Sequence, residues 1–264
     1  GGPGALVRGA GRAAGGGMTL YGAIVQPFIE FGFMRRALVA CLALGLSCGP
    51  VGTLLVLRRM SLAGDAMAHA LLPGAAVAFL LVGLSLPAMS LGAFIAALAV
   101  AALAGGVARF TAQREDASLA GFYLIALAGG VMLISLRGNS VDLMRVLFGS
   151  ILAVDDAALL LVAGVSSASL VVLALVWRPL LVECFDPGFL RAVGGHGALH
   201  HQLFLVLLVA NLVAGFQALG TLMAVGLLML PAIAARCWAH SVAQLSAIAC
   251  ASATACGWGG LLLS

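Results

Sequence analysis

An aspartate and a histidine, Asp65 and His69, stand four positions apart in an otherwise apolar stretch of the sequence. If the stretch is helical, both side chains lie on one face with their Cβ atoms about 5–6 Å apart. A carboxylate and an imidazole at that separation can share a divalent transition-metal ion. The spacing also suits an Asp–His hydrogen bond that joins two helices, or an aspartate that caps a helix start, so it leaves these alternatives open.

A second pattern, Phe185-Asp186-Pro187, is typical of a helix start, because aspartate is a good N-cap and proline suits the first helical position. Gly194-Gly195 then supplies a stop signal. The sequence therefore predicts a short helix from Pro187 to Val193. Such a helix either docks a soluble partner or merely joins two longer helices, and both interpretations stay open.

The remaining polar residues favour structural roles. His196, His200 and His201 lie together in the same region, where solvated loop histidines are commoner than metal ligands. The six cysteines show no CxxC spacing and are interpreted as small hydrophobic residues. The sequence contains no Walker A, GxSxG or HExxH motif. We therefore expect no enzymatic activity in this chain, and active transport would need a separate ATPase subunit or an ion gradient.

Composition defines the class of protein that must position these residues. Of the 264 residues, 63% are hydrophobic and 8% are charged, whereas soluble domains carry about 25% charged residues. This excludes a cytosolic enzyme, a secreted domain and a disordered chain. Because about 20 apolar residues cross a bilayer, the chain is also too long for a single anchor. In the membrane interior an ionised aspartate costs at least about 2.5–3.5 kcal/mol, so Asp65 needs a partner or a function.

The apolar runs predict an all-α, polytopic membrane bundle with about seven or eight spans. Residues 1–17 are interpreted as an unstructured leader or an added extension, and residues 18–264 as the membrane domain. Within that domain we expect an interfacial helix over 18–36, a short surface helix in 146–156, a polar segment over 178–200 and a kink or break at Pro231. The predicted spans are 37–57, 66–85, 88–108, 117–136, 157–177, two within 201–235, and 241–263.

All 13 basic residues are arginine, and the formal net charge is +4. They stand singly or in pairs between apolar runs, as in the loops of a membrane protein and unlike a nucleic-acid-binding patch. Counting alternate connections predicts that the segment 178–200 faces the cytoplasm. The arginines expected on that side are Arg58, Arg59, Arg109, Arg114, Arg178, Arg191 and Arg236, against Arg35, Arg36, Arg137 and Arg145 on the other.

The stretch from Leu57 to Gly74, with its string Gly-Asp-Ala-x-x-His-Ala-x-x-Pro-Gly, resembles the zinc and manganese ABC transporter permeases. Further matches occur in family order across roughly residues 20–264, namely 33–38, Glu115-Asp116, 147–152, 185–187 and 220–232. The string around Asp65 and His69 is highly specific, whereas the alanine-rich spans are not. Ala68 stands where a serine is common, and the family usually continues past the equivalent of Ser264 with a further apolar helix.

The resemblance implies a permease subunit of an ATP-driven importer of zinc or manganese, with iron also suited to the ligand types. It further implies alternating access, a homodimer in the bacterial inner membrane, a cytoplasmic ATP-binding subunit and an extracytoplasmic metal-binding protein. No permanently bound cofactor and no nucleic acid are expected. Asp65 and His69 would line the metal path. The residues implied to contact the ATPase are Asp186, Pro187, Phe189, Leu190, Arg191 and Gly194.

Three other functions remain as alternatives. A permease for siderophores or cobalamin would be longer, and a bulky chelate would not need an Asp–His pair. An ion-coupled secondary transporter would be expected to show inverted repeats with paired broken helices, and no convincing internal repeat is visible. An intramembrane enzyme is the least favoured, because no catalytic set accompanies Asp65 and His69.

Overall fold

The structure is a computed structural model that describes residues 32–263 apart from 84, 112–114, 136–154 and 193–196. Every regular element in these ranges is an α-helix. The predicted leader, the surface helix in 146–156 and most of the interfacial helix over 18–36 lie outside the described residues. The helices are α2 (Gly32–Leu57), α3 (Ser61–Val82), α4 (Leu86–Phe110), α5 (Glu115–Ser135), α7 (Asp156–Phe185), α8 (Pro187–Ala192), α9 (Gly197–Leu219), α10 (Thr221–Arg236) and α11 (Val242–Leu263).

Length and apolar composition explain most of these helices. Six of the described helices, α2, α3, α4, α7, α9 and α11, are long and apolar enough to cross a membrane. Shorter apolar stretches lie in α5 and α10. The prediction of an all-α, multi-pass membrane bundle is therefore confirmed, although α2 begins at Gly32 and not at 37.

The predicted polar segment over 178–200 is wrong at both ends. Helix α7 continues through Arg178 and Pro179 to Phe185, and α9 begins at Gly197, so His200 and His201 are helical. The apolar side chains around Arg178 keep one helix face packed, with Leu180 fully buried. A single arginine on the exposed side of such a helix does not end it, because its long side chain can reach the polar boundary of the membrane.

Of the kink or break predicted at Pro231, the break is wrong. Pro231 lies inside the continuous helix α10, and the chain breaks instead at Gly220, between α9 and α10. Gly220 has a φ of +84°, a conformation that glycine adopts without the steric cost of a side chain. Its N–H still donates to the carbonyl of Phe216 at 3.0 Å, which closes the last turn of α9.

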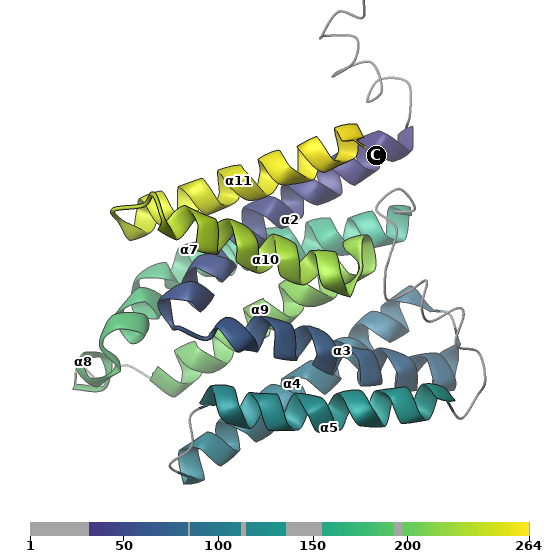
Figure 1. Cartoon of the computed structure of the whole chain (residues 1–264), viewed down its shortest axis with the longest axis horizontal. Coiled ribbons are helices and arrows are strands. Elements are labelled where there is room, and N and C mark those ends of the chain that lie inside the picture. Colours follow the sequence, from purple (N-terminus) through teal and green to yellow (C-terminus); the bar gives the residue numbers. More distant parts are fainter. Residues whose placement is uncertain (1–31, 84, 112–114, 136–154, 193–196, 264) are drawn as a thin grey trace, which may run out of the picture.

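The helices form two groups joined by α9. Helices α3, α4 and α5 lie together on one side, and α2, α10 and α11 lie on the other (Figure 1), while α9 contacts members of both groups. The core around α9 contains the fully buried Phe204, Leu208 and Leu212. Glycine permits the closest contacts, since a Cβ on Gly52 would lie only 2.1 Å from the carbonyl oxygen of Leu228.

One end of the bundle collects the connections between several helices. The α2–α3 turn, the α7–α8–α9 region and the α10–α11 connection all lie at the left of Figure 1. Arg58 in the α2–α3 turn contacts His201 on α9, and Arg236 at the end of α10 reaches the carbonyl of Val56 at 3.5 Å. We call this the arginine-rich end. Helix α3, with Asp65 and His69 in its first turns, starts there.

Candidate functional site

Helix α3 brings Asp65 and His69 together as the spacing predicts. Nε2 of His69 lies 3.6 Å from Oδ1 of Asp65, beyond hydrogen-bond distance. The Asp65 side chain is 57% exposed and that of His69 is 38% exposed, so the pair is neither sealed in the core nor fully open. Helix α3 begins at Ser61, earlier than predicted, which places both residues inside its first three turns.

The separation of these two atoms suits a shared metal ion. Bonds of roughly 2.0–2.2 Å from a transition metal to nitrogen and oxygen allow one ion to bridge donors 3.6 Å apart. In the part of the chain that the structure describes, no group of three or more His, Cys, Asp or Glu side chains could hold a metal. Two donors leave most coordination positions to water or other groups, which suits an ion that binds briefly.

Tyr123 on α5 is a further residue of this site, and the sequence analysis did not identify it. Its ring stacks on the imidazole of His69, with centroids 5.8 Å apart and planes at 23°. Nδ1 of His69 is buried and has no hydrogen-bond partner, so Nε2 is the nitrogen available beside Asp65. The available signal was the rarity of tyrosine, since the chain contains only two.

Close packing fixes the rest of α3. A Cβ on Gly64 would meet the sulfur of Met229 on α10 at 2.9 Å, and one on Gly130 of α5 would meet the Cα of Pro73 at 3.1 Å. Both distances are tighter than ordinary van der Waals contact. The face of α3 that carries His69 and Pro73 is thus held against α5, and the position of the imidazole depends on this contact.

The second predicted segment forms α8, close to the bounds expected from its sequence. The N–H of Phe189 donates to Oδ1 of Asp186 at 2.8 Å, which is the predicted N-cap contact. Phe189 is exposed and Leu190 is half-buried, and the backbone of Pro187 and Arg191 lies within the helix. Gly194 lies outside the described residues. The segment forms a short capped helix with an exposed aromatic side chain at the arginine-rich end.

The histidines of the 196–201 region do not form a metal site within the described residues, where no suitable group of three ligands exists. His196 lies outside those residues. Nδ1 of His201 lies 2.7 Å from Nη1 of Arg58. All six cysteines are free; Cys41 and Cys48 are buried, whereas Cys237 and Cys256 are exposed.

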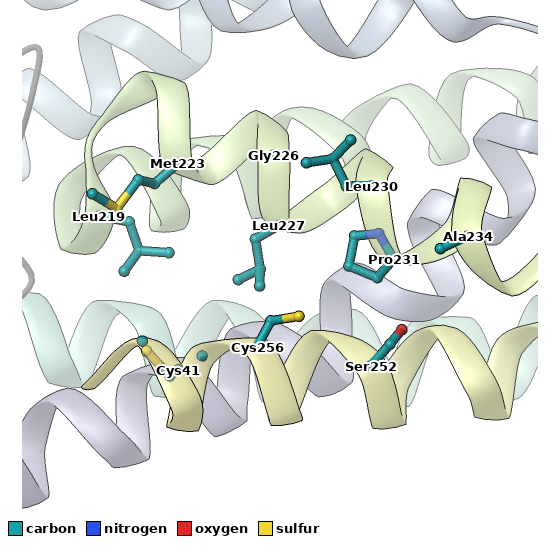
Figure 2. A pocket seen from close by; sticks show the side chains of 12 residues that line it. Cys41, Leu219, Met223, Gly226, Leu227, Leu230, Pro231, Ala234, Ser252 and Cys256 are labelled. Atoms are coloured by element: carbon teal, nitrogen blue, oxygen red, sulfur yellow. The ribbon is translucent and has the colours of Figure 1, made fainter. Parts of the chain in front are cut away.

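An apolar cavity of about 500 Å³ lies between α2, α10 and α11. Figure 2 shows Leu227 and Pro231 of α10 facing Cys256 and Ser252 of α11, with Cys41 of α2 nearby. Its lining is almost wholly apolar and does not include Asp65 or His69. The cavity is therefore separate from the Asp65–His69 pair and offers no carboxylate or imidazole to a metal ion.

Known proteins resemble the chain over most of its length. The manganese import system permease protein ScaB of Streptococcus parasanguinis is 36% identical over 213 residues, which is 81% of this chain and 75% of that protein. The manganese transport system membrane protein MntC of Halalkalibacterium halodurans is 34% identical over 204 residues, covering 77% of this chain and 68% of the relative.

A solved structure also resembles this chain in its fold. The structure titled "PsaBC from Streptococcus pneumoniae in complex with Fab" superimposes with a TM-score of 0.77 and 29% sequence identity, covering 91% of this chain and 90% of that one. Residues 30–264 match the family described as "ABC 3 transport family". The resemblance seen in the sequence is confirmed, and the chain belongs to the ABC 3 transport family.

Proposed function

We propose that this protein is the membrane-spanning permease of an ATP-driven manganese importer. The named activity of the two relatives supports manganese as the cargo. The observation that carries the proposal is the Asp65–His69 pair, in which one carboxylate oxygen and one imidazole nitrogen lie 3.6 Å apart on a partly exposed face of α3. Carboxylate and imidazole are also ligands for zinc and ferrous iron, so these ions are the competitors to be tested.

The pair would hold the ion briefly during alternating access. An extracytoplasmic binding protein delivers Mn²⁺ to one side of the membrane, Oδ1 of Asp65 and Nε2 of His69 take it, and it leaves on the other side. His69 must be neutral to act as a ligand, because a protonated imidazole has no free lone pair. Two protein donors form a weak site, which permits release of the ion.

ATP hydrolysis would occur in a separate cytoplasmic subunit. Helix α8, with Asp186 at its cap and Phe189 exposed, is the surface proposed to contact that subunit, together with Leu190, Arg191 and Gly194. We place the arginine-rich end in the cytoplasm of a bacterial cell, because cytoplasmic loops are enriched in arginine. A homodimer in the plasma membrane would bring two copies of the Asp65–His69 pair to one pathway.

Uptake of ⁵⁴Mn²⁺ by cells that express the chain with its transport partners tests this function. Asp65→Ala and His69→Ala should each reduce uptake by about a hundredfold or more, because a lost ligand removes the site. His240→Ala is the matched control, since His240 is exposed at another helix end and should leave uptake unchanged. Normal uptake by both Asp65→Ala and His69→Ala would overturn the proposed role of the pair. Competition by unlabelled Zn²⁺ and Fe²⁺ then identifies the preferred ion.

A further inference from the structure

Arg58 connects the α2–α3 turn to the two helices that flank α8. Its Nη1 lies 2.7 Å from Nδ1 of His201 on α9, and its guanidinium carbon lies 4.5 Å from the centre of the Phe204 ring. The thiol of Cys184, near the end of α7, interacts electrostatically with the same guanidinium. One side chain from the turn before α3 therefore contacts the helix that follows α8 and interacts electrostatically with the end of the helix that enters it.

The chemistry of the two side chains decides which of them donates the hydrogen bond between Arg58 and His201. A guanidinium can only donate hydrogen bonds, so Nδ1 of His201 is the acceptor in this contact. The Phe204 ring below the guanidinium is fully buried, and an arginine over an aromatic face is stabilised by a cation–π interaction. Arg58 is therefore held by two side chains on one face of α9, His201 and Phe204.

The turn that carries Arg58 is short and hydrogen-bonded. The N–H groups of Arg58 and Met60 donate to carbonyls in the last turns of α2 at 3.0 and 3.2 Å, and Met60 accepts from Ala63 at 3.1 Å. Arg59 closes the turn with a φ of +55°. The turn leads directly into α3, which carries Asp65. A displacement of Arg58 would therefore also move the start of α3.

One carboxylate oxygen of Glu183 is an acceptor without a partner, and Arg58 has donor atoms without partners. Its Nε and Nη2 are buried without partners, and so is Oε2 of Glu183 on α7. Glu183 directly precedes Cys184, whose thiol interacts electrostatically with both groups. Among the described residues no ion pair joins Arg58 to Glu183. Because a buried polar atom without a partner is costly, an approach of α7 to the turn that joined Arg58 to Glu183 would be favoured.

We propose that Arg58 is a positioning residue for transport, which contacts His201 in the present arrangement and pairs with Glu183 when α8 moves. The exchange would shift α3, and with it Asp65 and His69, without Arg58 touching the metal ion. This inference rests on the proposed function. Its geometric basis is that Arg58 directly precedes the helix of the proposed metal ligands, whereas Glu183 and His201 lie on the two helices that flank α8.

The test uses proteoliposomes that contain the chain with its co-purifying ATPase subunit and binding protein. Arg58→Gln and Glu183→Gln are compared with the wild type and with Arg178→Gln, an exposed arginine of α7. Three quantities are measured: ⁵⁴Mn²⁺ uptake, ATP hydrolysis, and ⁵⁴Mn²⁺ binding to the solubilised complex without ATP. We expect uptake per ATP to fall about tenfold or more in both variants, as for lost coupling between sites, while binding stays within about twofold and Arg178→Gln behaves as the wild type.

Two results would overturn this role. Unchanged uptake per ATP in Arg58→Gln would exclude it, and a parallel loss of metal binding would show that Arg58 only supports the fold of the site. If Arg58→Gln does not assemble, Glu183→Gln decides the question, because it removes the charge that Arg58 would pair with, and wild-type uptake per ATP in that variant would also exclude the role. Absence of ⁵⁴Mn²⁺ uptake by the wild type would contradict the proposed function instead, so the two failures are distinguishable.

Discussion

At the scale of single residues, the contact between His69 and Tyr123 determines how the proposed ligand His69 is held. A metal-binding histidine usually donates its second N–H to a carboxylate, carbonyl or water. Here Nδ1 of His69 has no such partner and lies buried, while the ring stacks on Tyr123. The orientation of the imidazole therefore depends on an aromatic face and not on a hydrogen bond.

Substitutions at Tyr123 distinguish the ring from its hydroxyl. Tyr123→Phe keeps the stacking and should transport Mn²⁺ as the wild type does. Tyr123→Leu removes an aromatic contact worth about 0.5–1.5 kcal/mol, so the KM for uptake should rise by roughly two- to tenfold with a smaller change in the maximal rate. Initial rates of ⁵⁴Mn²⁺ uptake over a range of concentrations provide the measurement. Equal KM values for the phenylalanine and leucine variants would contradict the stacking role.

The placement of Asp65 and His69 on one helix face could be predicted from the sequence, but their surroundings could not. The four-residue spacing of Asp65 and His69 determines that they share a helix face once the segment is helical. The contact with Tyr123 depends on how α3 and α5 pack, and that packing follows from Gly130 meeting Pro73. No local pattern encodes such a contact between segments so far apart in the sequence.

At the scale of the elements, α8 depends on one side chain for its start. The carboxylate of Asp186 accepts the N–H of Phe189 at 2.8 Å. A short isolated helix is marginal without such support, and the loss of an N-cap costs about 0.5–2 kcal/mol. The six residues of α8 are thus held in place by the cap and by the ends of α7 and α9.

Asp186→Ala should weaken the proposed attachment of the ATPase. Losing the cap raises the free energy of the helical state by about 1 kcal/mol, so less ATPase should co-purify and uptake should fall several-fold. Asp186→Ser, which can still cap the helix, is the matched control and should retain most of the attachment. The measurement is the ratio of ATPase to permease after affinity purification. The role fails if the alanine variant retains a wild-type ratio and wild-type uptake.

The close contact between α2 and α10 provides a stability prediction. A Cβ on Gly52 would lie 2.1 Å from the carbonyl oxygen of Leu228, so Gly52→Ala must push the helices apart. We expect a loss of about 1–3 kcal/mol, the usual range for overpacking, and a lower Tm in detergent. Gly129→Ala on α5 is the control, because nothing lies within 4 Å of its Cβ position. Equal Tm values for the two variants would contradict the predicted tight contact.

Hydropathy predicted which helices exist more reliably than where they end. The apolar runs located the spanning helices, but α7 passes through Arg178 and Pro179 because the surrounding apolar residues continue to pack. Pro231 did not break α10, whereas Gly220, which the sequence analysis did not consider as a break, separates α9 from α10. Whether a glycine or a proline ends a helix depends on the tertiary packing around it, which a local sequence pattern does not show.

At the scale of the whole molecule, several arginines lie toward the same end of the bundle as α8. Arg58, Arg178 and Arg236 lie toward the end that also carries α8, whereas Arg36 lies at the opposite end and pairs with Asp156 at 2.9 Å. The alternation of connections predicted this separation from the sequence. The meeting of Arg58 with α9 at that end could not be predicted, since it requires the packing of α2, α7 and α9 together.

Cys237 allows the proposed orientation to be tested with a native thiol. It is exposed and lies at the end of α10, beside Arg236 at the arginine-rich end. Because arginine-rich loops face the cytoplasm, a membrane-impermeant maleimide should label it in inside-out vesicles and not in intact cells. The exposed Cys256 lies within the apolar helix α11, where a maleimide in water has little access. Cys237→Ser should therefore abolish most of the labelling. Labelling of Cys237 from outside intact cells would show the opposite orientation, in which α8 does not face the side where ATP is hydrolysed.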